Sequence, residues 1–333
     1  MTVATILPEL AQCPTVLDTE AALIREVEKG LRRSPKSLAP WMFYDANGSR
    51  LFERITTLAE YYPSRIEREI LARFADEIVA RVRPDRSQTL RVFELGAGTA
   101  VKTGILLEAV VRTHGPVTYA PCDISPEALS QACASIDSIL PTVELEPVVG
   151  DYVTDPPQLT RVKATTLALY IGSSIGNFSP QAARTVLRNL RAQMRGGDTL
   201  LLGTDMVKDE ETLLAAYDDS KGVTAEFNLN ILRRLNRELG SDFNAAAFRH
   251  RVRWNQAYAR IEMHLESLRE QTVWIPAAKL LLHFAKGETI HTENSYKFTE
   301  NTIGGMLADA GFRIQRMWKD PLEWYALTLA APQ

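Results

Sequence analysis

The sequence predicts an α/β protein, a doubly wound parallel sheet with an inserted lobe of helices and antiparallel strands. Five short apolar segments alternate with helical segments between residues 90 and 206, a pattern typical of a parallel sheet covered by helices on both faces. From about 208 to 250 the chain turns helical, and segments 258–268 and 288–298 then alternate with period two, as antiparallel strands do.

The elements are predicted from apolar periodicity and turn residues. Residues 1–18 are expected to form a loosely held arm, and amphipathic helices follow over 21–33 and 65–82. The five strands are predicted to begin at residues 90, 117, 143, 167 and 199, with helices over 102–112, 126–136 and 184–194 between them. A helix over 300–310 and a strand over 324–330 are predicted to return the chain to the main sheet.

These elements suggest four parts. Residues 19–64 are a helical segment that contributes to the inserted, substrate-binding lobe, and residues 65–207 form the ligand-binding sheet domain. Residues 208–298 form most of the inserted lobe, and residues 299–333 complete the core sheet.

The composition is that of an ordinary soluble globular protein, with 45% apolar and 24% charged residues in 333. A net charge of −3 gives no electrostatic reason to expect a nucleic-acid partner, although Arg249, Arg251 and Arg253 form a local basic cluster. Three cysteines without paired or metal-ligand spacing predict a reducing compartment and no metal site. With no secretory signal and no long apolar run, we expect a cytoplasmic monomer without a membrane partner.

A glycine turn follows the first strand of the alternating series, in the sequence Glu94-Leu95-Gly96-Ala97-Gly98-Thr99. Glycines here let the backbone approach a ligand at the carboxyl edge of the sheet. Val101 stands where a dinucleotide fingerprint has its third glycine, which disfavours NAD and FAD. An acid before G-x-G is instead the pattern of class I methyltransferases, which have a Rossmann-like sheet and bind S-adenosyl-L-methionine.

Two further strands end in acids. Asp123 ends the second strand, where a carboxylate can bind both ribose hydroxyls, and Asp151 ends the third, where it can meet the adenine amino group with Tyr152 beside the ring. Each acid could alternatively be a helix cap, Asp123 for the helix that begins at Pro126. Three consecutive strands with suitable ends favour the methyltransferase interpretation.

The chain resembles the histidine-specific N-α-methyltransferase family of ergothioneine biosynthesis, which also contains fungal N-methyltransferases of tryptophan derivatives. The resemblance extends from about Glu20 to Ala330. The motifs that carry it are Pro35-Lys36-Ser37-Leu38, Trp41-Met42-Phe43-Tyr44-Asp45, Glu60-Tyr61-Tyr62-Pro63, Glu94-Leu95-Gly96, Gly172-Ser173-Ser174-Ile175-Gly176-Asn177, Leu202-Gly203-Thr204-Asp205, Ala216-Tyr217-Asp218-Asp219, Gly222-Val223-Thr224-Ala225 and Arg260-Ile261-Glu262-Met263.

The resemblance implies roles for individual residues. S-adenosyl-L-methionine would be held by Tyr44, Gly96, Lys102, Asp123 and Asp151, with Lys102 at its carboxylate. The carboxylate and amine of an amino-acid substrate would be held by Tyr61, Asn177 and Tyr217, with the backbone at Gly172 against the amine, and Asn177 and Tyr44 are the candidate catalytic residues. Phe52 and Met263 would line the side-chain pocket, and Glu293 and Ser295 would bind an imidazole.

Alternation places Glu293 and Ser295 on one strand face with His291 and Lys297, and Ile290, Thr292, Tyr296 and Phe298 on the other. From the pattern alone the Glu293 face could equally be solvated, Met263 could be a core residue, Tyr61 and Tyr217 could be core tyrosines, and Asn177 could be a turn residue. Asn294 departs from the family, which often has an aliphatic residue there, but alternation directs it away from Glu293.

The resemblance implies methylation of the α-amino group of L-histidine and of its methylated forms, up to the trimethylated betaine hercynine. An N-methyltransferase of tryptophan, or of another aromatic amino acid or amine, would share the cofactor residues and differ around Met263 and Glu293. A non-catalytic S-adenosylmethionine-binding protein would not need Asn177 and the tyrosines of the second lobe. A nucleic-acid methyltransferase is disfavoured, because no D/N-P-P-Y/F loop follows the fourth strand.

Overall fold

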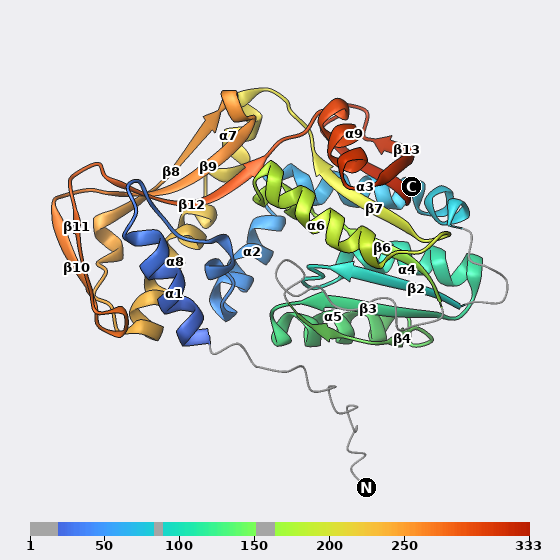
Figure 1. Cartoon of the computed structure of the whole chain (residues 1–333), viewed down its shortest axis with the longest axis horizontal. Helices are drawn as coiled ribbons and strands as arrows, with labels where there is room; N and C mark the ends of the chain where they lie inside the picture. Colours follow the sequence, from blue (N-terminus) through green and yellow to red (C-terminus); the bar gives the residue numbers. More distant parts are fainter. Residues whose placement is uncertain (1–18, 83–88, 151–163) are drawn as a thin grey trace, which may run out of the picture.

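A computed structural model describes residues 19–82, 89–150 and 164–333, and Figure 1 shows two parts side by side. One part is built on a large, mostly parallel sheet. The other is built on a smaller sheet with helices α1, α2 and α8 beside it and a long hairpin at the far end. The predicted arm, residues 1–18, lies outside the described residues.

The main sheet has the strand order β13-β14-β7-β6-β2-β3-β4, with the short β5 also on β3. Neighbours pair in parallel from β4 to β7, and β14 runs antiparallel to both β7 and β13. The strands are β2 (Thr89–Leu95), β3 (Val117–Asp123), β4 (Glu144–Leu145), β5 (Val148–Val149), β6 (Ala164–Tyr170), β7 (Thr199–Asp205), β13 (Phe312–Lys319) and β14 (Tyr325–Pro332).

Helices cover both faces of this sheet, as the doubly wound prediction requires. Leu90, Val92 and Leu167 belong to the apolar core with α3 (Tyr62–Arg81), α4 (Val101–His114) and α5 (Pro126–Ile139). Phe93 and Ala168 point the other way, into the core with α6 (Pro180–Gln193) and α9 (Glu300–Asp309). Both faces of these strands are buried under helices, which confirms the predicted fold class.

The second part contains a four-stranded sheet of order β1-β12-β9-β8 and the hairpin β10–β11. Helices α7 and α8 pack on this sheet, and α2 packs on α8. The elements are α1 (Thr19–Leu31), β1 (Lys36–Ser37), the 3-10 helix η1 (Pro40–Phe43), α2 (Ala46–Thr56), α7 (Glu210–Tyr217), α8 (Val223–Leu239), η4 (Ala245–Ala247), β8 (Phe248–Asn255), η5 (Gln256–Tyr258), β9 (Arg260–Ser267), β10 (Gln271–Ile275), η6 (Pro276–Ala278), β11 (Leu280–Phe284) and β12 (Thr289–Tyr296).

Some element predictions are wrong. The strand expected over 143–152 is two short pieces, β4 and β5, because Pro147 between them has no N–H to donate to a ladder. The helical stretch ends before residue 248, and β1, β8, β10, β11 and β13 were not predicted. The division at residues 64, 207 and 298 stays a prediction.

Two arginines of the basic cluster are paired with one acid. Arg249 and Arg251 lie on β8 and both pair with Glu266 of β9, at 2.6 and 2.8 Å. Within residues 19–82, 89–150 and 164–333, no helix is both long and apolar enough to cross a membrane.

Candidate active site

The glycine turn between β2 and α4 is open at the carboxyl edge of the main sheet. Gly96 and Gly98 have φ angles of 66° and 52°, and Ala100 follows with 54°. These left-handed conformations favour glycine. A Cβ at Gly98 would meet no atom within 4 Å, so this turn leaves room for a ligand against the backbone.

Asp123 lies at the end of β3 beside this turn. Its carboxylate accepts hydrogen bonds from the backbone N–H of Gly98, at 3.3 Å, and of Ser125, at 3.0 Å. Burial raises the pKa of Asp123, while these N–H groups act to lower it. Ser125, and not Asp123, is the N-cap of α5, because its side chain accepts from Ala128 at 3.2 Å. Asp151 and Tyr152 lie outside the described residues.

Glu94, the acid before the glycines, points into the core instead of toward a ligand. Its carboxylate accepts from Thr103 of α4 at 2.8 Å and from Tyr119 of β3. Burial raises the pKa of Glu94 to about 7, although these hydrogen bonds lower it. This motif residue therefore ties α4 to the sheet.

Lys102 forms an ion pair with Glu67, a fully buried carboxylate of α3. Glu67 also accepts from the Gly172 N–H, at 2.8 Å, and from the Tyr325 hydroxyl, at 2.6 Å. A Cβ at Gly203 would lie 2.4 Å from Glu67 Oε1, so a glycine is needed there. Glu67 thus positions two predicted site residues, Lys102 and Gly172. This role was not predicted, because Glu67 stands in the sequence as one more acid of an amphipathic helix.

The loop after β6 brings Asn177 to the second lobe. Gly172 and Ser173 have φ angles of 83° and 58°, and Asn177 ends the 3-10 helix η3 (Ser174–Asn177). Gly176 lies against β12, where an added Cβ would be 2.8 Å from the Tyr296 carbonyl oxygen. The small residues of this motif therefore let η3 and β12 approach closely.

Four of the aromatic residues predicted for the site form a continuous row of rings. Tyr44 and Phe52 have ring centroids 5.9 Å apart, Phe52 and Tyr61 are 6.2 Å apart, and Tyr61 and Tyr217 are 6.2 Å apart. All three pairs meet edge to face. The row ends at Ser295, whose Oγ is 2.7 Å from the Tyr217 hydroxyl.

A β-bulge in β12 corrects the predicted strand faces. His291 pairs with His264, yet Glu293 pairs with the next residue back, Met263, so that Thr292 is the extra residue. His291 therefore lies on the opposite face from Glu293, where its ring is 4.9 Å from that of His264. The extra residue shifts the alternation by one.

Ile290 and Thr292 share the Glu293 face, contrary to the prediction. Thr292 donates to Asn228 of α8 at 2.8 Å, and Asn228 contacts His250 Nδ1 at 2.8 Å. His250 Nε2 then contacts the Tyr217 carbonyl oxygen at 2.8 Å. The bulge residue is thereby linked to the backbone that carries Tyr217.

Glu293 is half-buried on the inner face beside Met263, which is 2% exposed. Burial raises the pKa of Glu293 to about 7, while Lys297 acts to lower it. Besides burial, the charge of Glu293 helps to raise the pKa of both Tyr61 and Tyr217 well above 10. The predicted substrate residues are therefore close enough to act on one another.

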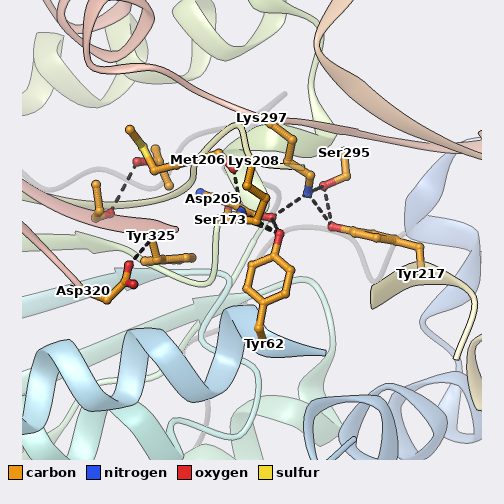
Figure 2. A network of polar contacts seen from close by, with 12 residues as sticks. Tyr62, Ser173, Asp205, Met206, Lys208, Tyr217, Ser295, Lys297, Asp320 and Tyr325 are labelled. Carbon is orange, nitrogen blue, oxygen red and sulfur yellow. Dashed lines mark hydrogen bonds and ion pairs between the residues drawn. The ribbon is translucent and has the colours of Figure 1, made fainter. Parts of the chain in front are cut away.

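A buried polar network connects Tyr217 and Ser295 to Asp205 through Lys297 (Figure 2). The carboxylate of Asp205, at the end of β7, contacts Lys297 at 2.7 Å, Lys208 at 2.5 Å and the Tyr62 hydroxyl at 2.9 Å. Burial acts to raise the pKa of Asp205, but the two lysines lower it. Asp205 and Tyr62 stand in the family motifs and Lys297 lies on the predicted strand face of Glu293, but no sequence pattern predicted a role for any of the three.

The open glycine turn at the carboxyl edge of a mostly parallel sheet, with Asp123 on the next strand, defines a class I S-adenosylmethionine-dependent methyltransferase. The family model described as histidine-specific methyltransferase, SAM-dependent, matches residues 23–332, and the chain belongs to this family.

Two curated proteins illustrate the similarity. The chain is 42% identical to a histidine N-alpha-methyltransferase of Mycobacterium tuberculosis (strain CDC 1551 / Oshkosh) over 310 residues, which are 93% of this chain and 95% of that protein. It is 33% identical over 212 residues to ergothioneine biosynthesis protein 1 of Neurospora crassa, covering 62% of this chain and 23% of that protein. Among solved structures, an S-adenosylmethionine-dependent methyltransferase from Clostridium acetobutylicum ATCC 824 aligns with a TM-score of 0.45 and 11% identity over 79% of this chain and 91% of that one.

Proposed function

We propose that the protein transfers methyl groups from S-adenosyl-L-methionine to the α-amino group of L-histidine, in up to three steps, to give hercynine. The observation that carries this proposal is the half-buried carboxylate of Glu293, next to Ser295 and Met263, at the end of the row of aromatic residues. A carboxylate and a hydroxyl suit the two nitrogens of an imidazole.

The residues around the glycine turn fit S-adenosyl-L-methionine. The open backbone at Gly98 can receive the ligand and Asp123 beside it can bind the ribose hydroxyls. Lys102, which is paired with Glu67, can also pair with the cofactor carboxylate, and Gly96 belongs to the same turn. The remaining proposed cofactor residues are Tyr44, Asp151 and Tyr152. When bound, the cofactor supplies a methyl group on a sulfonium, which is already a good leaving group.

The work of the protein is then to align the substrate amine. Asn177 can accept from the amine and donate to the substrate carboxylate, because an amide has both groups. Tyr61, Tyr217 and the backbone at Gly172 complete this part of the site in our proposal. A correctly oriented amine at near-attack distance accounts for most of the acceleration.

The product of complete methylation is a quaternary ammonium, so the pocket must be able to hold a cation that has no N–H to donate. The aromatic rings of Tyr44, Phe52 and Tyr61 are close together, and our proposal places the amine against them. Such rings attract a cation without needing to donate or accept a proton. The same surface can therefore hold the amine at each stage of methylation.

We further propose that the enzyme is a cytoplasmic monomer that acts on a free amino acid, without nucleic acid or membrane as partner. The net charge of −3 and the pairing of Arg249 and Arg251 with Glu266 support the absence of a nucleic-acid partner, and the cysteine spacing supports the cytoplasm.

A substrate screen with Glu293→Ala tests the proposal. Wild type should methylate L-histidine and its mono- and dimethyl forms, and react poorly with L-tryptophan and L-phenylalanine. Glu293→Ala should cost histidine about 2–4 kcal/mol in kcat/KM, because a charged hydrogen bond is lost and its partner is left unpaired. It should leave an apolar aromatic substrate nearly unchanged. Wild-type preference for tryptophan, or equal damage to both substrates, would reject histidine as the substrate.

A further inference from the structure

The ammonium of Lys297 has all of its donors engaged by three oxygens. Lys297 Nζ lies 2.7 Å from Asp205 Oδ2, 2.8 Å from the Tyr217 hydroxyl and 2.9 Å from Ser295 Oγ, as Figure 2 shows. Its side chain is fully buried. An ammonium has three donors and no acceptor, so Lys297 donates to both hydroxyls and neither hydroxyl proton can point toward it.

This arrangement determines the direction of the remaining protons. Tyr217 and Ser295 are 2.7 Å apart, so one of the two hydroxyls donates to the other. A phenol is a stronger acid than an aliphatic alcohol, so Tyr217 donates to Ser295. Ser295 then accepts from both Lys297 and Tyr217, its lone pairs are filled, and its own proton remains free to be donated to a third group.

We propose that Lys297 is a positioning residue that makes Ser295 an obligatory hydrogen-bond donor toward the substrate ring. This inference rests on the proposed function, since it assumes that the ring is an imidazole. Glu293 takes the ring N–H, and the free hydroxyl proton of Ser295 goes to the nitrogen with the free lone pair. Lys297 therefore selects a ring that carries an acceptor nitrogen as well as a donor.

Lys208 provides a matched control, because it pairs with the same carboxylate from the other side. Its Nζ contacts Asp205 Oδ1 at 2.5 Å, the Tyr62 hydroxyl at 2.8 Å and the Met206 carbonyl oxygen at 2.6 Å. In Figure 2 the Tyr62 and Tyr217 rings lie on different sides of Asp205. Lys208→Met thus removes a buried cation from Asp205 without removing a donor to Ser295 or Tyr217.

The test compares three substrates in the full-length enzyme with S-adenosyl-L-methionine. L-Histidine has both ring groups, pyrrolylalanine keeps an N–H but no acceptor nitrogen, and 4-thiazolylalanine keeps an acceptor nitrogen but no N–H. In Lys297→Met, the preference for histidine over pyrrolylalanine should fall about tenfold, the size of one buried hydrogen bond, mainly through KM. The preference over 4-thiazolylalanine should stay within about twofold, because it depends on Glu293.

Lys208→Met should leave both preferences unchanged. The inference is wrong if the two lysine variants shift the pyrrolylalanine preference equally, or if Lys297→Met lowers kcat/KM for all three substrates by one factor. If Lys297→Met does not fold, Asp205→Asn combined with Lys297→Met removes both charges of the pair and carries the same expectation. Failure of wild type to methylate histidine would instead contradict the proposed function.

Discussion

The cofactor edge and the substrate pocket are built in different ways. At the cofactor edge, Gly96, Gly98 and Asp123 lie at the ends of adjacent strands, and the Gly98 N–H donates to the Asp123 carboxylate across the turn. The substrate pocket joins side chains from α2, α3, α7, β9 and β12. Its polar floor is a buried cluster around Asp205 that joins the start of α3 to the segments after β7 and β12. The first region depends on local conformation, and the second on a nonlocal charge network.

The largest expected effect is that of breaking this network. Asp205→Ala leaves Lys297 and Lys208 buried without their shared partner, and should lower the free energy of unfolding by about 3–5 kcal/mol. Urea denaturation measures this, with Asp205→Asn as the milder control. A loss below that of Asp123→Ala would mean that the two regions do not differ as described.

A smaller and more local effect is expected at the cofactor edge. Asp123→Ala should weaken binding of S-adenosyl-L-homocysteine by about 1.5–3 kcal/mol, as expected for lost hydrogen bonds to a charged group, with little change in stability. Isothermal titration gives the affinity. Unchanged affinity in the folded variant would remove Asp123 from the ribose site.

A substitution of Asn177 tests whether substrate use can be impaired without loss of cofactor binding. Asn177→Ala should lower kcat/KM for histidine by about 1–2 kcal/mol, through a lost hydrogen bond, and keep the affinity for S-adenosyl-L-homocysteine. Steady-state kinetics and titration on the same preparation distinguish these effects. Equal damage to both would show that Asn177 only supports the loop after β6.

The smallest effect concerns pH. Because burial raises the pKa of Glu293 from 4.5 to about 7, the folded state keeps a proton that the unfolded state has lost. The contribution of Glu293 to stability is therefore greatest below pH 4.5 and declines as pH rises to about 7. Glu293→Gln should flatten this part of the pH profile in urea denaturation. An unchanged slope would show that Glu293 is already ionised in the folded protein.

The fold and the cofactor edge could be predicted because their signals are local. Alternating segments gave the parallel sheet, and Gly96, Gly98 and Asp123 follow strands directly. The substrate pocket was harder to predict. The bulge at Thr292 cannot be recognised in a period-two sequence pattern, and it places His291 on the opposite strand face. Lys297 could not be distinguished from a solvated lysine, since its partners Asp205 and Tyr217 are 92 and 80 residues away in the chain. The resemblance to a family supplied Ser295 and Tyr217, but not the lysine that donates to both.

His250 shows how this protein holds an imidazole of its own. Asn228 Nδ2 donates to Nδ1 of His250, whose Nε2–H meets the Tyr217 carbonyl oxygen, so the ring is a neutral single tautomer with one nitrogen accepting and one donating. Burial lowers the pKa of His250, although the carbonyl acts to raise it, and this keeps the ring neutral. We propose that the neighbouring pocket treats free histidine in the same way, with Ser295 in the place of Asn228 and Glu293 in the place of the carbonyl. His250 is held by a backbone carbonyl and an amide, whereas the free ligand would be held by a carboxyl and a hydroxyl, and in both sites one acceptor and one donor select the neutral ring.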